Sequence, residues 1–162
     1  MSTIKVDVYT DGSAKNNGTY NSCGGWAFVT LVEDTVVKYK HGAVSGATNQ
    51  QMELKAVVEA CKYIRKIFPR DFMDFNIYSD SAYVINCKKQ RWYKKWLQNG
   101  WTNSKNEPVK NKEYWEQLVP FFEDNHFKFH KVKGHADNPY NNAADNLAQA
   151  AASVCKLEET VE

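Results

Sequence analysis

The apolar residues of this 162-residue chain alternate in some segments and recur every three to four residues in others. The order of these segments constrains the fold more than any other feature of the sequence. Residues 4–8 alternate between apolar and polar and predict a strand that ends near Asp11. Residues 25–32 and 35–44 predict two further strands joined by a short turn, which favours an antiparallel hairpin.

The apolar period changes to that of a helix at residue 48. Thr48 is the expected N-cap and Gln51 its capping-box partner, while Leu54, Val57 and Ile64 belong to one buried stripe. The remaining elements are predicted as a strand over 72–78, helical residues from 81 to 99 in one or two pieces, a helix over 111–124, a strand over 127–132 and an Ala-rich helix over 141–155. This order predicts an α/β fold, with a mixed five-stranded sheet that begins antiparallel, continues through parallel crossovers and is flanked by helices.

Length and composition predict one globular domain over 1–162, with a core at about 3–155 and a frayed tail at 156–162. The sequence contains no apolar run of membrane-spanning length and no signal-peptide pattern in its first residues, so no membrane partner is expected. The cysteines, Cys23, Cys61, Cys87 and Cys155, contain no Cys-x-x-Cys pair. This spacing argues against zinc and predicts reduced thiols in a cytoplasmic protein. We also expect a monomer.

The net charge of +2 conceals a strongly basic segment, residues 88–112, which we call the basic block. It contains eight Lys or Arg residues against a single acid, Glu107, and the rings of Trp92, Trp96 and Trp101 lie among these cations. A solvated helix face, with the rings packed against the body of the protein, is one interpretation. The other is a nucleic-acid groove, in which cations meet phosphates and rings meet sugars or bases.

Four carboxylates, Asp11, Glu53, Asp80 and Asp145, are each predicted at a strand end or helix start. Each has an ordinary explanation: a turn for Asp11, a helix cap for Asp80, and a first-turn charge on a helix dipole for Glu53 and Asp145. Together, however, they occur where an α/β sheet gathers its ligand site. The negative charges of such a cluster would repel one another, so a cation is needed to stabilise them. Mg²⁺ fits because it prefers carboxylate, water and phosphate oxygens. His135, in a polar loop, suits proton transfer. We therefore expect metal-assisted phosphodiester chemistry on a nucleic acid.

These residues resemble the type 1 ribonucleases H, in the form that carries a basic protrusion. The resemblance runs from residue 6 to about 152. It rests on Tyr-Thr-Asp-Gly-Ser at 9–13, Thr-Asn-Gln-Gln-Met-Glu-Leu at 48–54, Ser-Asp-Ser at 79–81, Asn-Gly-Trp at 99–101, Pro-Val-Lys-Asn at 108–111, Val-Lys-Gly-His-Ala at 132–136 and Ala-Asp-Asn-Leu-Ala at 144–148. It implies a ribonuclease-H-like fold and hydrolysis of the RNA strand of an RNA–DNA hybrid, leaving 5′-phosphate and 3′-hydroxyl ends.

The resemblance also implies a role for each site residue. Asp11, Glu53, Asp80 and Asp145 match the metal-binding residues for two Mg²⁺ ions, with Mn²⁺ as a substitute, when substrate is bound. In that arrangement Asp11 bridges both ions, Asp145 helps to hold the ion that activates water, and Glu53 and Asp80 hold the ion at the leaving oxygen. His135 matches the family's loop histidine, which assists proton transfer or product departure.

Contacts to the hybrid are implied as well. Asn17, Asn49 and Gln50 match residues that read RNA 2′-hydroxyls in the minor groove, and Thr48 and Asn111 match a pocket for a DNA phosphate. The DNA-side channel and the protrusion match Tyr83, Lys88, Lys89, Trp92, Lys94, Lys95, Trp96 and Trp101. The sequence departs from the family at Gly46, where some members carry Arg, in the loop after Asp11, and by one residue inserted before Trp92.

Three other identities compete with that of a free-standing ribonuclease H. A non-catalytic hybrid-binding module would have no need of four carboxylates. A DNA-directed nuclease or recombinase of the wider fold would lack the hybrid-reading Asn and Gln residues. A ribonuclease H domain excised from a reverse transcriptase would share all of these motifs, so it stays open as the alternative.

Overall fold

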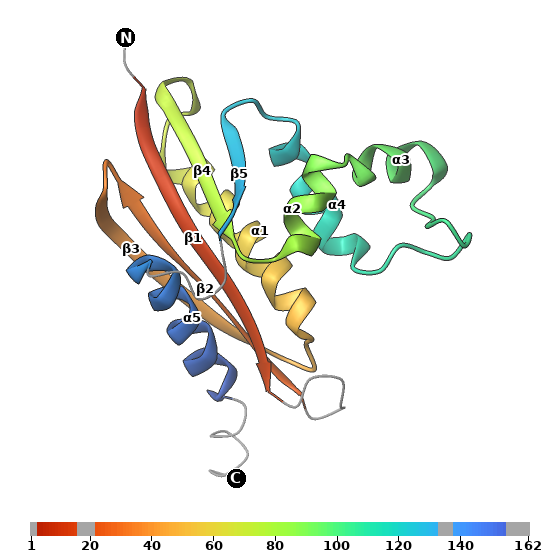
Figure 1. Cartoon of the computed structure of the whole chain (residues 1–162), viewed down its shortest axis with the longest axis horizontal. Coiled ribbons are helices and arrows are strands. Elements are labelled where there is room, and N and C mark those ends of the chain that lie inside the picture. The colour runs from red at the N-terminus through yellow and green to blue at the C-terminus, as the bar shows by residue number, and fades with distance from the viewer. Residues whose placement is uncertain (1–2, 16–21, 133–137, 155–162) are drawn as a thin grey trace.

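The computed structural model describes residues 3–15, 22–132 and 138–154, and its central element is a five-stranded sheet in the order β3-β2-β1-β4-β5. The strands are β1 (Ile4–Lys15), β2 (Cys23–Val32), β3 (Thr35–Ser45), β4 (Met73–Ser79) and β5 (Phe127–Lys131). The pairs β1–β2 and β2–β3 are antiparallel, whereas β1–β4 and β4–β5 are parallel (Figure 1). The predicted mixed sheet is confirmed.

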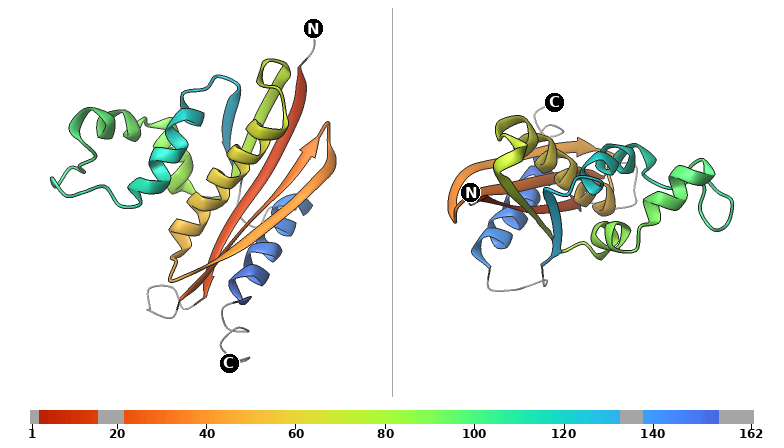
Figure 2. Two further views of the ribbon diagram at one scale, coloured as in Figure 1. Left: turned by 180° about the vertical axis from the view of Figure 1, so that it is seen from behind. Right: turned by 90° about the horizontal axis from the view of Figure 1, so that it is seen from above.

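Helices lie on both faces of this sheet and beyond its β5 edge (Figures 1 and 2). They are α1 (Asn49–Ile67), α2 (Ala82–Lys89), α3 (Trp92–Asn99), α4 (Lys112–Phe122) and α5 (Pro139–Ala152), with a short 3-10 turn at Arg70–Phe72. Helix α1 covers one face and α5 the other, while α3 and the segment after it extend away from the sheet. Within the described part of the chain, no helix has both the length and the apolar content that a bilayer span requires.

The main core lies between α1 and the sheet. Val8 of β1, Phe28 of β2 and Ile77 of β4 are fully buried there against the stripe of α1 that contains Leu54. Thr48 caps α1 with the capping box expected from its sequence, because its side chain accepts from Gln51 N and the Gln51 side chain accepts from Thr48 N. This cap fixes where α1 begins, and therefore where Glu53 lies.

Two element boundaries differ from those predicted. Strand β1 does not end near Asp11 but continues to Lys15, because residues 11–15 stay paired with β2. Helix α5 begins at Pro139 instead of residue 141, because Asn138 caps it by accepting from the next two backbone N–H groups and Pro suits the first helical position. Strand pairing and capping extend these elements into polar sequence, where the apolar pattern carries no signal.

The cysteines also depart from expectation. Cys61 and Cys87 are free and buried, as predicted for reduced thiols. Cys23, at the start of β2, is disulfide-bonded, so the prediction of four reduced thiols is wrong for Cys23.

Candidate active site

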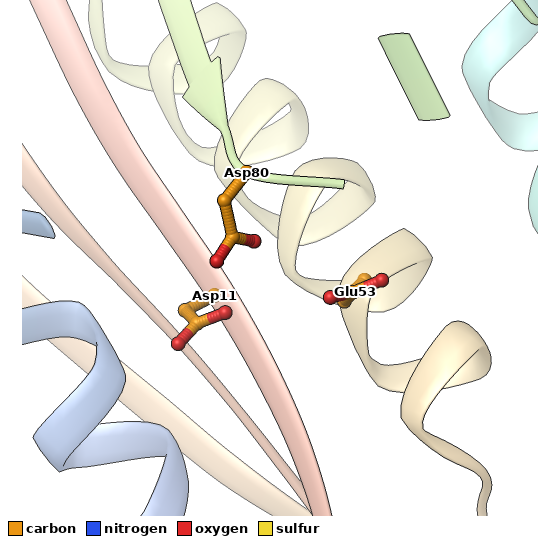
Figure 3. A group of neighbouring side chains, drawn as sticks. All are labelled: Asp11, Glu53 and Asp80. Carbon is orange, nitrogen blue, oxygen red and sulfur yellow. The ribbon is translucent and has the colours of Figure 1, made fainter. Parts of the chain in front are cut away.

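Three of the four predicted carboxylates meet at one point on the sheet. Asp11, Glu53 and Asp80 each offer an oxygen, and these oxygens lie within 4.8 Å of one another (Figure 3). They come from β1, from α1 and from the residue that follows β4. Residues from three separate parts of the sequence therefore form one acidic cluster, whose oxygen donors suit a hard divalent cation.

Asp11 lies just beyond the point where β1 and β4 stop pairing. The two strands pair in parallel up to Tyr9 and Tyr78, and the Thr10 hydroxyl donates to the Tyr78 carbonyl at 2.9 Å. Beyond that point β4 ends, whereas β1 continues on β2 with Asp11 opposite Ala27. Asp11 is thus mid-strand and not in a turn, and it lies at the carboxyl end of the neighbouring parallel strand, where ligands bind in open α/β sheets.

Gly12 is a site residue that the sequence reasoning missed. A Cβ at this position would overlap the backbone carbon of Met52 and the backbone nitrogen of Glu53. Only glycine therefore lets the second turn of α1 lie directly against β1, which brings Glu53 beside Asp11. The only sequence signal for it is the Asp-Gly pair, which is also typical of a turn.

The helix-dipole and capping explanations do not hold for three of the carboxylates. Neither α1 nor α5 has an acidic residue in its first turn, so Glu53 and Asp145 lie beyond the reach of the N-terminal dipole. The N-cap of α2 is Ser81, whose side chain accepts from Val84 N at 3.3 Å, and not Asp80. Ser81 also hydrogen-bonds the Glu53 carboxylate, a contact that the sequence did not predict.

Asp145 approaches the cluster from the opposite face of the sheet. It lies on α5, which packs on β1, β2 and β3, and its side chain hydrogen-bonds that of Asp11. The Gln149 side-chain amide, one turn further along α5, donates to both oxygens of Asp145 at 3.1 and 3.0 Å. Gln149 was not predicted from the sequence. Asp11 therefore stands between the Glu53–Asp80 pair and Asp145.

The electrostatics of the cluster favour protons when no cation is bound. Burial, a hydrogen bond that protonated Asp11 donates to the Asp145 carboxylate, and the charge of Asp80 raise the pKa of Asp11 to about 8. Burial and the charge of Asp80 raise the pKa of Glu53 to about 7, although the Ser81 hydrogen bond opposes this shift. Carboxylates held this close need either a proton or a cation to be stable together.

Stability should therefore depend on pH and metal together. Because these folded pKa values exceed the ordinary values of 3.8 and 4.5, the folded state binds more protons than the unfolded state between those limits. Stability from this source is complete at acid pH and is lost as pH rises through about 7 to 8. We expect millimolar Mg²⁺ to raise the melting temperature at pH 8.5 and hardly at all at pH 5.

Thermal melts of the parent and of Asp11→Asn/Glu53→Gln test this expectation. The double variant lacks both titrating groups, so its melting temperature should respond less to Mg²⁺ at alkaline pH. An equal response of both proteins would place the ion elsewhere.

A second feature lies beside the cluster, at the start of α1. A hollow of about 660 Å³ is lined by Thr48, Asn49, Gln50, Gln51, Lys110 and Asn111. Asn49 Oδ1 accepts from Ala14 N at 2.7 Å, and the Gln51 side chain donates to Asn111 at 3.4 Å. The structure thus brings together four of the predicted substrate contacts, from sequence regions some sixty residues apart.

The basic block contains both packed and exposed residues. Trp96 lies 5.6 Å from the fully buried ring of Trp115, and Trp92 and Trp101 are likewise partly buried against the core, as is Tyr83 of α2. The expectation that some of these rings pack the block against the body is confirmed, whereas the proposed contacts of the block with nucleic acid remain a prediction. Lys88 is also partly buried and donates to the Phe122 carbonyl at 2.7 Å, so it caps the end of α4. Three other lysines of the block, Lys89, Lys94 and Lys95, are exposed.

Asn17 and His135 lie outside the described residues, so their predicted roles remain predictions.

Comparison with known proteins decides the family. The RNase H family model matches residues 3–153. A protein named ribonuclease H from Clostridium botulinum is 42% identical over 147 residues, covering 91% of this chain and 95% of the relative. The chain belongs to the ribonuclease H family. It is an enzyme of that family, as the sequence resemblance predicted.

Solved structures agree with this assignment. The foamy viral protease-reverse transcriptase in complex with dsDNA superposes with a TM-score of 0.79 at 25% identity, covering 92% of this chain and 94% of that chain. LC9-RNase H1, described as a type 1 RNase H with the type 2 active-site motif, gives a TM-score of 0.78 at 26% identity, covering 95% and 74%. The ribonuclease H fold is therefore established for this chain.

Proposed function

We propose that this ribonuclease H hydrolyses the RNA strand of RNA–DNA hybrids with two bound Mg²⁺ ions, leaving 5′-phosphate and 3′-hydroxyl ends. The observation that carries the proposal is the convergence of Asp11, Glu53 and Asp80 within 4.8 Å, with Asp145 on the other side of Asp11. Three carboxylates with a fourth next to the central one fit a pair of cations better than a single ion.

Each carboxylate then has a defined task. Glu53 and Asp80 would hold one cation, Asp145 the other, and Asp11 would contact both. When bound, Mg²⁺ lowers the pKa of a ligated water and neutralises charge on the attacking and leaving oxygens. Ser81 and Gln149 orient Glu53 and Asp145 through the hydrogen bonds described above. We assign His135 to proton transfer near the phosphate.

Substrate recognition is proposed for two neighbouring surfaces. The hollow at the start of α1 offers the side chains of Thr48 and Asn111 for a phosphate, while Asn49 and Gln50 suit the 2′-hydroxyl edge of an RNA strand. The exposed lysines of the basic block add phosphate contacts that do not depend on sequence. Hybrid selectivity would then come from the α1 hollow, and general affinity from the block.

One assay tests this function directly. Matched RNA–DNA hybrid, double-stranded RNA and double-stranded DNA are incubated with the protein, with and without Mg²⁺, and the ends of the products are mapped. Cleavage of the hybrid's RNA strand alone, dependent on Mg²⁺, is expected. Cleavage of double-stranded DNA, or metal-independent cleavage of the hybrid, would contradict the proposal.

A ribonuclease H domain excised from a reverse transcriptase is the weaker alternative. The foamy viral chain is 25% identical, whereas the Clostridium relative is 42% identical and is covered over 95% of its length.

The basic block should govern affinity and leave chemistry unchanged. Replacing the exposed Lys89, Lys94 and Lys95 with alanine should raise KM and flatten the dependence of hybrid affinity on salt. Each lost phosphate contact lowers the log–log slope by about 0.9 on a B-form duplex. Turnover at saturating hybrid should change little. Lys88 is left intact because it caps α4.

Hybrid affinity measured from 50 to about 300 mM salt checks this expectation. Alanine at Lys38, Lys62 and Lys66, which are exposed residues of β3 and α1, is the matched control, with the same loss of charge. Parallel salt plots for the parent and the block variant would mean that the block lysines only solvate a surface.

A further inference from the structure

A network of side-chain hydrogen bonds joins the start of α1 to the start of α4 and to α2. Gln51 Nε2 donates to Asn111 Oδ1 at 3.4 Å. Asn111 Nδ2 in turn donates to the Tyr83 hydroxyl at 3.4 Å, and Trp115 Nε1 donates to the same hydroxyl at 3.3 Å. We call these four side chains the Gln51–Trp115 network. Gln51 and Asn111 also line the α1 hollow, so the network reaches the surface there.

A backbone N–H group fixes the direction of the hydrogen bonds at the α1 end of the network. Thr48 N can only donate, so the Gln51 atom that lies 3.0 Å from it is the side-chain oxygen. The Gln51 amide nitrogen therefore faces Asn111, and the Asn111 atom opposite that nitrogen is an oxygen, because only an acceptor can lie there. The NH₂ group of Asn111 is consequently turned toward Tyr83.

The indole of Trp115 fixes the direction at the other end. Trp115 is fully buried, and its ring N–H is a donor only, so the Tyr83 oxygen accepts from it. The same oxygen accepts from Asn111, and both acceptor positions of the hydroxyl are then occupied. Within the described part of the chain, no acceptor receives the Tyr83 O–H or the second N–H of the Asn111 amide. The network thus leaves two neighbouring donors for a ligand.

Helix capping does not explain this arrangement. Asn111 is the N-cap residue of α4, with a left-handed φ of 63°, yet its side chain forms no capping hydrogen bond. Asparagine is favoured at N-caps because its oxygen accepts from the first turn of the helix, whereas here that oxygen accepts from Gln51. The capping box of α1 uses the Gln51 oxygen and leaves the bond from the Gln51 nitrogen without a role in the cap. The side chain of Asn111 is therefore oriented by Gln51 and not by its own helix.

We propose that Gln51 is a positioning residue for substrate, which turns the Asn111 amide so that its N–H, together with the Tyr83 hydroxyl, donates to a phosphate of the bound hybrid. Donors whose direction is fixed in advance suit a phosphate, because less side-chain entropy is lost when the ligand binds. Lys110, an exposed residue that also lines the α1 hollow, adds a positive charge beside them. The inference rests on the proposed binding of hybrid at this hollow, and Gln51 acts there through Asn111.

Gln51→Glu tests this role, because glutamate also completes a capping box but cannot donate to Asn111. The melting temperature should therefore stay close to that of the parent. The Asn111 amide should turn its NH₂ group to the new carboxylate and its oxygen to the phosphate. Affinity for fluorescein-labelled RNA–DNA hybrid, measured by anisotropy in EDTA, should fall at least ~10-fold. In Mg²⁺, KM should rise by a similar factor, with a much smaller change in kcat.

A double-mutant cycle with Asn111→Gly separates positioning from direct repulsion between the new carboxylate and the phosphate. Glycine suits the left-handed φ at 111, and without the Asn111 amide Gln51→Glu should have little further effect on affinity. Gln117→Glu makes the same charge change further along α4, beside Lys62, and should bind hybrid like the parent.

The outcomes distinguish this inference from the proposed function. An equal effect of Gln51→Glu in both backgrounds, or parent-like affinity of Gln51→Glu, would overturn the positioning role, and hydrolysis of hybrid by the parent would still stand. Coupling between the two positions in a parent that binds hybrid but does not cleave it would support the positioning role and contradict only the hydrolysis. A parent that binds no hybrid would overturn both.

Discussion

Replacing Asp80 with asparagine is expected to reduce cleavage of RNA–DNA hybrid by at least ~1,000-fold while the protein stays folded and binds hybrid. Asp80 follows β4 and contributes to the three-carboxylate cluster, so its charge serves the site and not the core. Loss of one carboxylate weakens the hold on a cation that neutralises developing charge, an effect of several kcal/mol. Since 1.36 kcal/mol corresponds to a factor of ten in rate, a ~1,000-fold lower cleavage rate is equivalent to about 4 kcal/mol of lost transition-state stabilisation.

Single-turnover cleavage, hybrid affinity and thermal melting measured on the same preparation separate the possible causes. Asp71→Asn is the matched control, because Asp71 is exposed in the turn before β4 and should behave like the parent. A folded Asp80→Asn enzyme that keeps a tenth of the parent rate in Mg²⁺ would remove Asp80 from the catalytic site.

Gly12→Ala is expected to have the second largest effect, and it should act on stability and activity together. The added Cβ would overlap the backbone of Met52 and Glu53, which cannot rotate away as a flexible side chain can. Helix α1 must therefore move from β1. Overpacking of this kind costs ~1–3 kcal/mol or more. The same movement separates Glu53 from Asp11, so cleavage should fall at least ~100-fold even where the variant is folded.

Urea unfolding and cleavage at a temperature where the variant is fully folded test this prediction. Gly46→Ala is a suitable control, because Gly46 has a φ of +78° and open space around its Cβ position. It measures the cost of placing a Cβ on left-handed backbone without any overlap, ~1–2 kcal/mol. If Gly12→Ala matched this control in both stability and cleavage, then close approach of α1 would not set the geometry of the site.

Much of the fold could be predicted because its determinants are local. Alternation marks the strands, the buried stripe that includes Leu54 and Ile64 marks α1, and the Thr48–Gln51 capping box sets where that helix starts. The sequence also marks the candidate carboxylates, because they occur where apolar segments give way to polar ones. Local patterns of this kind are physical consequences of burial and of unsatisfied helix ends, so they can be detected without tertiary contacts.

Only the tertiary structure decided how these residues act together. The apolar pattern ends at Asp11, yet β1 continues because β2 supplies hydrogen-bond partners for its backbone. Alternation of apolar residues shows which side chains are buried, but it does not show which strands pair. In the sequence Gly12 resembles a turn residue, whereas in the structure the backbone of α1 lies directly against it. The sequence allows the tryptophans of the basic block to be either exposed or packed. The structure places Trp96 beside the buried Trp115. A sequence carries the chemistry of each residue, whereas distances between residues far apart in the chain arise only when the elements pack.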